Sequence, residues 1–322
     1  MGTRKLSDLL KYLSMVKPGR KITGIAAALL PLDEDGRISE DAYVRHLQAT
    51  QSAGLTNAVN MDTGYVNYLS DEEKLRVLGL ARDALGSSVR FIAGAYIEGK
   101  EGDPVSLYRA EIERILEFGG TPILFQSARI HGKSAAEKVA VYREVCKGLP
   151  EVLGFELGRM FAPNGEIFDE ETVAGLMEIP ELTGMKHSSL DKVTELERLQ
   201  IRDKIRPEFR IYTGNDLGID MIEYGSDYLL GLATFCPEKF AERDRMWETG
   251  DPAYFGLGDA LQHLGNVAFR APVPAYKHSA AAFLQMCGRI PTSRTHPRSH
   301  ERPAWECEIL ADCASRLGLA VT

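Results

Sequence analysis

Short apolar segments recur along most of this chain, and stretches with apolar residues at helical spacing lie between them. The apolar segments cover residues 22–30, 57–61, 90–95, 121–126, 152–157, 182–186, 209–213 and 227–231. The helical patterns between them cover residues 39–53, 70–85, 104–118, 134–147, 169–178, 191–203 and 215–224. The early segments recur roughly every 30 residues, which is the length of one strand–helix unit. The pattern therefore predicts an α/β fold in which eight strands and their helices form a (β/α)8 TIM barrel.

Three regions follow from this pattern. Residues 1–20 form an N-terminal helix and lead-in, with the helix expected over 4–16 and ended by Pro18-Gly19. Residues 21–250 form the barrel, which has the typical size of about 250 residues for this fold. Residues 251–322 form a C-terminal helical region, with helices expected over 252–269, 274–287 and 302–317. A doubly wound sheet is the alternative fold, but its GxGxxG fingerprint is missing after the first strand.

Composition excludes several classes of protein. The formal net charge is -8 and no long basic block occurs, so nucleic-acid binding is not expected. The longest apolar run, residues 24–32, is too short to span a bilayer, and the N-terminus does not resemble a signal peptide. The five cysteines form no CxxC pair, which favours reduced thiols in a cytoplasmic protein. The histidines form no HxH or HExxH motif, so neither a metal nor another cofactor is expected.

Lys186 is the strongest candidate for chemistry, because it follows an apolar run at 182–185. In a barrel of this type the carboxyl ends of the strands surround the active site. A lysine carried into that opening loses hydration, which lowers its pKa. A free lysine has a pKa of about 10.4, so a decrease of about three units would give a usable amine nucleophile. The alternative is a lysine at the barrel opening that is paired with a carboxylate.

Other polar residues are expected at the same opening. Asp62 and Glu156 lie at the ends of strands two and five, and Gln126, Asn215 and Asp216 lie near the ends of strands four and seven. Each has a structural alternative: Asp62, Asn215 and Asp216 could cap turns or helices. Glu156 could pair with a basic residue. His187, which follows the lysine directly, could be a hydrogen-bonded core histidine.

Several motifs together resemble the dihydrodipicolinate synthase and N-acetylneuraminate lyase family. The segment ITGIAAALLPLDEDGRISEDAYVRHL is similar to its first strand and helix, and GLTNAVNMDTGYVNYLSDEEK stands where the family has a threonine-threonine-glycine-glutamate loop. LTGMKHSS resembles the strand of the Schiff-base lysine, YTGNDL the glycine-aspartate turn after strand seven, and APVPAYK the entry to a C-terminal helix. The resemblance extends from about residue 21 to residue 319.

This resemblance implies that Lys186 condenses with the carbonyl group of a 2-oxo acid and that the protonated imine then acts as an electron sink. It also implies that Thr63 and Gly64 belong to the loop that binds the substrate carboxylate, and that Arg159 holds an anionic group near the entrance. Family members are commonly homotetramers, so a homo-oligomer, a tetramer or dimer, is expected here.

The chain departs from the family at informative positions. Asp62 replaces the first threonine of the carboxylate loop, and an ionised Asp62 about 4 Å from a substrate carboxylate would cost several kcal/mol at an effective dielectric near 20. Pyruvate is therefore disfavoured unless Asp62 is protonated or turned away. Gly154 aligns with the proton-shuttling tyrosine of strand five, so Glu156 or His187 is the candidate replacement.

The tyrosine pair expected in dihydrodipicolinate synthases is also absent from the fourth strand, which argues against that activity itself. The preferred hypothesis is an imine-forming lyase or aldolase that acts on a small oxo acid or sugar-acid-like carbonyl compound. Hydrogen bonds from Asp62, Gln126 and Asn215 would suit its hydroxyl groups. Two alternatives stay open: a barrel that binds a small molecule without catalysis, and a dehydratase or decarboxylase that uses the same imine.

Overall fold

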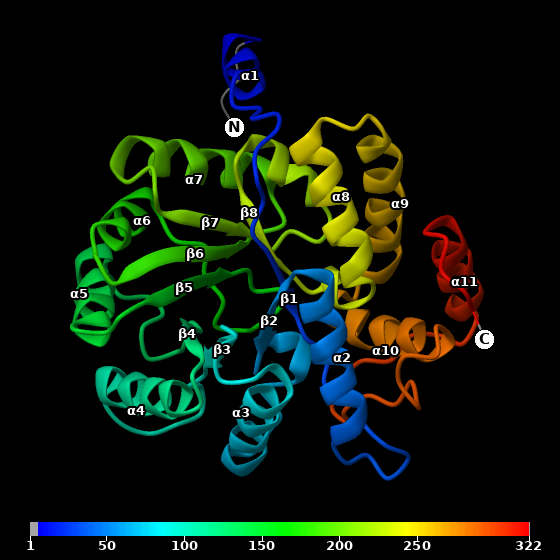
Figure 1. The fold of residues 1–322 in the computed structure, drawn as a ribbon. Coiled ribbons are helices and arrows are strands. Elements are labelled where there is room, and N and C mark those ends of the chain that lie inside the picture. The colour runs from blue at the N-terminus through cyan, green and yellow to red at the C-terminus, as the bar shows by residue number, and fades with distance from the viewer. Residues whose placement is uncertain (1–5, 322) are drawn as a thin grey trace.

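The computed structural model describes residues 6–321, and its centre is a closed barrel of eight parallel strands in sequence order (Figure 1). The strands are β1 (Gly24–Ala27), β2 (Thr56–Val59), β3 (Ile92–Ala95), β4 (Thr121–Leu124), β5 (Val152–Leu157), β6 (Leu182–Ser188), β7 (Arg210–Thr213) and β8 (Asp227–Leu230). The pairing of β8 with β1 closes the barrel. The predicted TIM barrel is thus confirmed, and the doubly wound sheet is excluded because an open sheet would leave two unpaired edges.

Helices surround the barrel and connect its strands. They are α2 (Glu40–Ala53), α3 (Asp71–Leu85), α4 (Pro104–Glu117), α5 (Ala135–Cys146), α6 (Glu170–Met177), α7 (Lys192–Ile205) and α8 (Pro237–Thr249). A side chain caps the N-terminus of five of them: Ser70, Asp103, Ser134, Asp169 and Asp191. Each such cap stabilises a helix by about 1 kcal/mol, because the side chain accepts a hydrogen bond from a first-turn amide that has no partner within the helix.

The segment after β7 differs from the prediction. The spacing predicts a helix over 215–224, whereas the structure has only the 3-10 helix η2 (Ile219–Tyr224). The Asp216 carboxylate accepts a hydrogen bond from the amide of Leu232, 2.7 Å away, just after β8. Because this bond and Gly218 hold residues 214–218 at the barrel opening, the helical turn starts only after them.

Two separate hydrophobic cores lie on the two sides of the barrel wall. The interior core contains alternate strand residues: Ile25, Ala27, Ala58, Ile92, Ile123, Leu153, Phe155, Leu157, Tyr212 and Leu229. The outer core lies between the strands and the helices and includes Met185 of β6. Since neighbouring residues of a strand point to opposite faces, the wall separates adjacent side chains of β5 and β6 into different environments.

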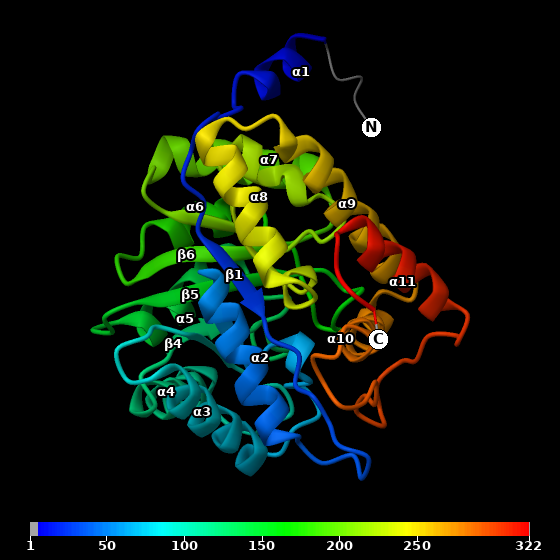
Figure 2. The ribbon, with the colours of Figure 1, turned by 45° about the vertical axis from the view of Figure 1, so that its right-hand side comes forward.

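The C-terminal region adds three helices, α9 (Ala253–Ala268), α10 (Tyr276–Met286) and α11 (Glu306–Arg316). Figure 2 shows α10 on the side of the molecule toward which the β1 arrow points. α10 contacts both α9 and α11. Tyr276 and Lys277 in its first turn bind the Asp62 carboxylate just after β2, so the extension is attached to the barrel opening. No helix within residues 6–321 is long and apolar enough to cross a membrane.

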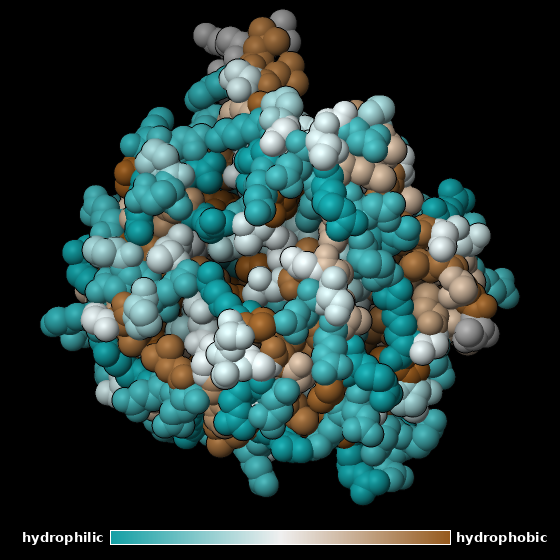
Figure 3. Space-filling view, in the orientation of Figure 1, coloured by the Kyte–Doolittle hydropathy of each residue, from teal (hydrophilic) through white to brown (hydrophobic). Residues whose placement is uncertain are grey.

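The N-terminal helix α1 (Leu6–Leu13) projects from the barrel (Figure 1). Leu10 and Leu13 are exposed, and Figure 3 shows hydrophobic atoms on this projection above a mainly hydrophilic surface. Residues 4 and 5 of the helix predicted over 4–16 lie outside the described residues.

Candidate active site

Lys186 lies inside the barrel opening, on β6. Gly184, Lys186 and Ser188 share one face of this strand, and the lysine lines a small pocket at the carboxyl ends of the strands. The pocket has a cavity volume of about 10 Å³, on the same measure as the volume given below for its neighbour. We call it the lysine pocket, and its lining residues are Met61, Asp62, Thr63, Phe155, Leu157, Phe161, Lys186, Ser188, Gly214, Asp216, Gly231, Phe269 and Tyr276.

The environment of Lys186 increases the fraction of neutral amine relative to a free lysine. Burial lowers the pKa of Lys186 from about 10.5 to about 8, although the carboxylates of Asp216 and Asp62 oppose this shift. The Lys186 nitrogen lies 4.5 Å from the centroid of the Phe155 ring. A ring face attracts a cation but cannot accept the proton. The lysine is therefore a weakly hydrated amine beside an apolar surface, which is the setting that an amine nucleophile requires.

Gly214 makes room for the lysine. A Cβ atom on Gly214 would lie 2.0 Å from the Ser188 hydroxyl oxygen and 2.5 Å from Cε of Lys186. Both distances are far below van der Waals contact, so a larger residue would displace the lysine or the serine. The two distances add to 4.5 Å, and the Ser188 oxygen cannot be farther than this from Cε of Lys186.

Asp216 is the second titratable group of this pocket. It is buried, and burial raises its pKa to about 7 despite the hydrogen bond from the Leu232 amide and the charge of Lys186. Asp216 and Lys186 therefore change protonation in neighbouring pH ranges. A carboxyl group in this state can exchange a proton with the amine or with a bound substrate near neutral pH.

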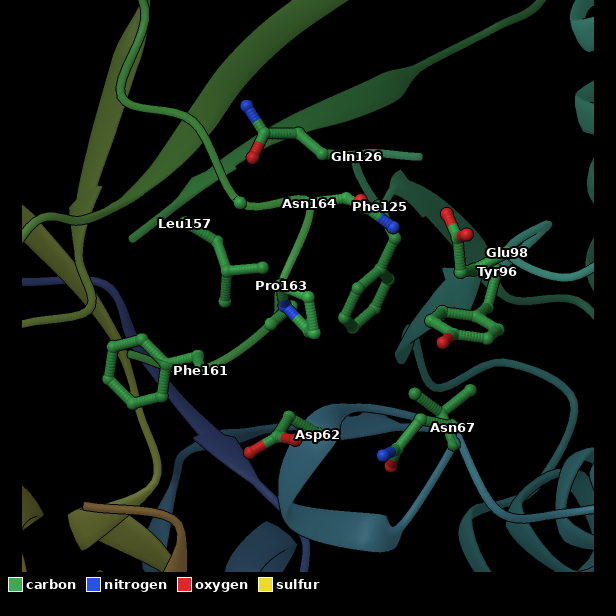
Figure 4. A pocket seen from close by; sticks show the side chains of 13 residues that line it. Asp62, Asn67, Tyr96, Glu98, Phe125, Gln126, Leu157, Phe161, Pro163 and Asn164 are labelled. Carbon is green, nitrogen blue, oxygen red and sulfur yellow. The ribbon is translucent and has the colours of Figure 1, made fainter. Parts of the chain in front are cut away.

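A larger pocket continues outward from the lysine pocket and has a volume of about 80 Å³ (Figure 4). We call it the outer pocket. It shares Asp62, Leu157 and Phe161 with the lysine pocket, and its other lining residues are Val66, Asn67, Tyr96, Glu98, Phe125, Gln126, Ala162, Pro163, Asn164 and Gly165. The shared residues make the two pockets one continuous site.

Tyr276 and Lys277 of α10 complete the site, and both were missed in the sequence. The Lys277 nitrogen lies 3.0 Å from Oδ1 of Asp62, and the Tyr276 hydroxyl donates a hydrogen bond to Oδ2 over 3.0 Å. Tyr276 also lies 2.8 Å from the hydroxyl of Thr63. The motif APVPAYK marks the helix entry, but the sequence does not indicate that it contacts a turn more than 200 positions earlier.

Known proteins that are similar to this chain include several synthases. No family model matches the chain. The 4-hydroxy-tetrahydrodipicolinate synthase of Parasynechococcus marenigrum is 28% identical over 273 residues, which cover 81% of this chain and 85% of that protein. These similarities support a divergent member of the dihydrodipicolinate synthase family. The synthase of Kosmotoga olearia is 23% identical over 197 residues, which cover 60% of this chain and 64% of that relative.

Solved structures of the family share the fold. A dihydrodipicolinate synthase from Acinetobacter baumannii, complexed with pyruvate, superimposes with a TM-score of 0.78. It is 17% identical in sequence, and the match covers 93% of this chain and 100% of that chain.

The residue of β5 that faces Lys186 is Phe155, not Gly154. Gly154 faces the outer core, where its Cβ position lies 3.3 Å from the Met185 side chain, whereas Phe155 pairs with Lys186 across the strands. The alignment of Gly154 with the family's tyrosine therefore requires a shift of one residue. The consequence for chemistry stays the same, because a phenylalanine has no hydroxyl to transfer a proton.

Glu156 and His187 do not join Lys186 in the pocket. Both are fully buried on the helix-facing side of the wall, where Glu156 Oε1 lies 2.5 Å from His187 Nδ1 and 2.9 Å from Nε of Arg198. Burial raises the pKa of Glu156, but His187 and Arg198 outweigh this effect and hold it at about 2. This corrects the choice of Glu156 and His187 as acid–base residues: the strand alternation points them away from the lysine.

The charge of Asp62 is compensated by Lys277 and the hydroxyl of Tyr276. From the sequence, pyruvate is disfavoured unless Asp62 is protonated or turned away. A carboxylate paired with Lys277 is a further case, and the pairing reduces the repulsion toward a substrate carboxylate beside Thr63.

The remaining predicted binding residues divide into two groups. Thr63 and Asp216 line the lysine pocket, and Gln126 lines the outer pocket. Both ends of the Gln126 amide already bind the backbone of Glu166, so this side chain holds the loop after β5 and has little capacity left for a ligand.

Gly64, Arg159 and Asn215 line neither pocket. Arg159 is exposed, and the Asn215 side chain accepts a hydrogen bond from the Leu217 amide. Asn215 thus stabilises the turn after β7, which was its structural alternative. Among the described residues no three His, Cys, Asp or Glu side chains are grouped to hold a metal ion.

Proposed function

We propose that the chain is a class I lyase in which Lys186 forms an imine with a small oxo acid or a sugar-acid-like carbonyl compound. The observation that carries this proposal is the position of Lys186 inside a barrel pocket and against the Phe155 ring, where desolvation lowers its pKa. Its neutral amine attacks the carbonyl carbon, and water leaves as the imine forms. The protonated imine then withdraws electrons from the neighbouring carbon–carbon bond.

The outer pocket supports a hydroxylated substrate. Its 13 lining residues include Asp62, Glu98, Asn67 and Asn164 but no lysine, arginine or histidine. A second anionic group would find no counter-charge there, whereas hydroxyl groups can donate to the carboxylate and amide oxygens. For this reason we propose a substrate other than the one used in dihydrodipicolinate synthesis.

The same imine could serve cleavage of a carbon–carbon bond, dehydration or decarboxylation, because the electron sink does not dictate which bond breaks. Product analysis after turnover distinguishes these reactions. A released aldehyde indicates an aldolase, an unchanged carbon count with loss of water indicates a dehydratase, and carbon dioxide indicates a decarboxylase.

Borohydride trapping tests the proposal directly. The protein is incubated with pyruvate and with 3-deoxy-2-oxo sugar acids, reduced with borohydride, digested and examined by mass spectrometry. We expect the mass increase on the peptide that contains Lys186. Lys186→Arg should abolish the adduct, while Lys192→Arg is the matched control, since Lys192 lies outside both pockets and pairs with Asp220. Turnover without any adduct at Lys186 would reject the imine mechanism.

A binding protein without catalysis is the second candidate, and Phe155 favours it because the residue beside the lysine cannot transfer a proton. A thermal-shift screen combined with turnover assays separates the two functions. Ligands that stabilise the protein but are never converted would support the binding protein.

We also propose a homo-oligomer in the cytoplasm. All five cysteines are free, as is usual for proteins kept in a reducing compartment. Light scattering coupled to size exclusion measures the molar mass, and a single 35.6 kDa species would contradict the oligomer.

A further inference from the structure

The first turn of α10 enters the barrel opening and carries a hydroxyl into the lysine pocket. Tyr276 is 3% exposed, and its hydroxyl donates to Asp62 Oδ2 and lies 2.8 Å from the hydroxyl of Thr63. The Tyr276 hydroxyl has one proton and donates it to Asp62, so in the bond between Thr63 and Tyr276 the Thr63 hydroxyl is the donor. The three groups form a continuous chain of hydrogen bonds along the pocket that contains Lys186.

The ring of Tyr276 is fixed in place. It stacks on Phe269 with a centroid distance of 4.3 Å and an interplanar angle of 17°. Gly231 lies against both rings: a Cβ atom there would be 3.0 Å from Tyr276 and 3.2 Å from Phe269. The hydroxyl is therefore held by ring packing as well as by its hydrogen bonds, which is the arrangement that proton transfer through fixed groups needs.

Imine formation requires two protons to move from nitrogen to oxygen. The lysine ammonium first loses one proton to the pocket, and the neutral amine forms the carbon–nitrogen bond. A second proton moves from the new nitrogen to the former carbonyl oxygen. The first proton then returns to this hydroxyl, the carbon–oxygen bond breaks, and water leaves. The protonated imine keeps the single positive charge, so atoms and charge balance.

Two carboxyl groups of the lysine pocket, Asp62 and Asp216, can hold the first proton and return it, and Asp62 is the one that is hydrogen-bonded to the Tyr276 hydroxyl. Phe155, the β5 residue beside the lysine, cannot. Asp62 is the carboxylate at the end of the hydrogen-bonded chain, and Lys277 fixes its other oxygen. A proton can pass from Asp62 to Tyr276 and on to Thr63, because each of these groups is hydrogen-bonded to the next.

We propose that Tyr276 is the proton-relay residue of the Lys186 reaction, linking Asp62 to the Thr63 hydroxyl that serves the leaving oxygen. This inference rests on the proposed imine chemistry. In this proposal the C-terminal extension supplies the hydroxyl group for proton transfer, because Phe155 of β5 has none. In the reverse direction the relay accepts the proton that water releases when it hydrolyses the imine.

Tyr276→Phe tests the relay, because it removes the hydroxyl and keeps the ring that stacks on Phe269. Tyr142→Phe is the matched control: Tyr142 is also buried, and its hydroxyl has no hydrogen-bond partner among the described residues. The measurement is the rate at which the borohydride-trapped adduct of Lys186 appears with a substrate that wild type accepts. We expect Tyr276→Phe to slow this rate by about 10²–10⁴-fold, the usual size of general acid–base catalysis, and Tyr142→Phe to leave it unchanged.

Two further readouts separate a relay from a structural role. The slowed Tyr276→Phe reaction should accelerate in proportion to the concentration of a small carboxylic acid buffer, whereas wild type should not. If Tyr276→Phe fails to fold, Thr63→Val breaks the same chain from the other end and should show the same slowing. Trapping at the wild-type rate in folded Tyr276→Phe, or in Thr63→Val, would overturn the relay. An absent adduct in wild type would instead overturn the imine proposal itself.

Discussion

The pKa of Lys186 can be tested without knowledge of the substrate. Burial sets this pKa at about 8, so the neutral fraction of the amine should rise from about 1% at pH 6 to about 91% at pH 9. An unshifted lysine with a pKa near 10.5 stays below about 4% neutral over the same range. Acylation by a small amine reagent follows the neutral fraction. Labelling of Lys186 should therefore increase about 90-fold between pH 6 and 9 and then level off.

The assay is competitive labelling at trace reagent concentration, with a lysine model peptide as internal standard. Mass spectrometry compares the label on the Lys186 peptide with the label on the standard at each pH. The standard should gain about tenfold per pH unit throughout this range. A Lys186 curve that follows the standard in parallel up to pH 9 would refute the desolvation argument.

The same shift should be visible in stability. The folded pKa of Lys186 lies below the unfolded value, so the unfolded chain binds more protons between about pH 8 and 10.5. Stability should rise with pH through this window, and below it the buried cation costs up to about 3 kcal/mol. Lys186→Met removes this cost and should raise the free energy of unfolding at pH 7, with a smaller gain at pH 10. An equal gain at both pH values would contradict the linkage.

Two further predictions concern the residues around the lysine. Glu156→Gln should lower the free energy of unfolding by about 3–5 kcal/mol in urea titrations, because it leaves the buried Arg198 without its carboxylate. The protein that remains folded should still trap an adduct at Lys186. A stable variant that has lost the adduct would contradict this. Gly214→Ala should abolish the adduct, because the added methyl group overpacks the lysine pocket. Gly154→Ala is the control and should keep the adduct, because its methyl group meets only the flexible Met185 side chain, at 3.3 Å. Loss of the adduct in Gly154→Ala but not in Gly214→Ala would refute the packing argument.

The barrel could be predicted from the sequence because its signals are local. Each strand is a short apolar run, and residues such as Ser70 and Ser134 mark helix starts with capping boxes. The same locality identified Lys186, since a lysine at the end of an apolar strand is visible in one short segment. Strand β6 continues two residues beyond the lysine, which changes the strand boundary but not the position of the side chain at the barrel opening.

The orientation of β5 could not be predicted, because both faces of a parallel barrel strand are buried. A half-buried strand alternates between apolar and polar residues, but β5 offers Phe155 to the interior and a fully buried Glu156 to the outer side. The polar residue belongs to an ion pair with Arg198, on a helix about 40 positions away. No pattern within the strand distinguishes a carboxylate that faces substrate from one that faces a buried arginine.

The carboxylate of Asp62 is connected to the C-terminal extension. Asp62 replaces a threonine of the family, and its carboxylate is the partner of a buried lysine, Lys277, which is 3% exposed. Restoring a threonine at position 62 alone would leave that cation unpaired, at a typical cost of 3–5 kcal/mol. Removing Lys277 alone would leave the carboxylate uncompensated beside Thr63. Asp62 and Lys277 are therefore energetically coupled, and with them the position of Tyr276, whose hydroxyl binds the same carboxylate. The C-terminal extension and the turn after β2 consequently act as one structural unit. The role of Asp62 therefore cannot be interpreted from its own segment of sequence alone.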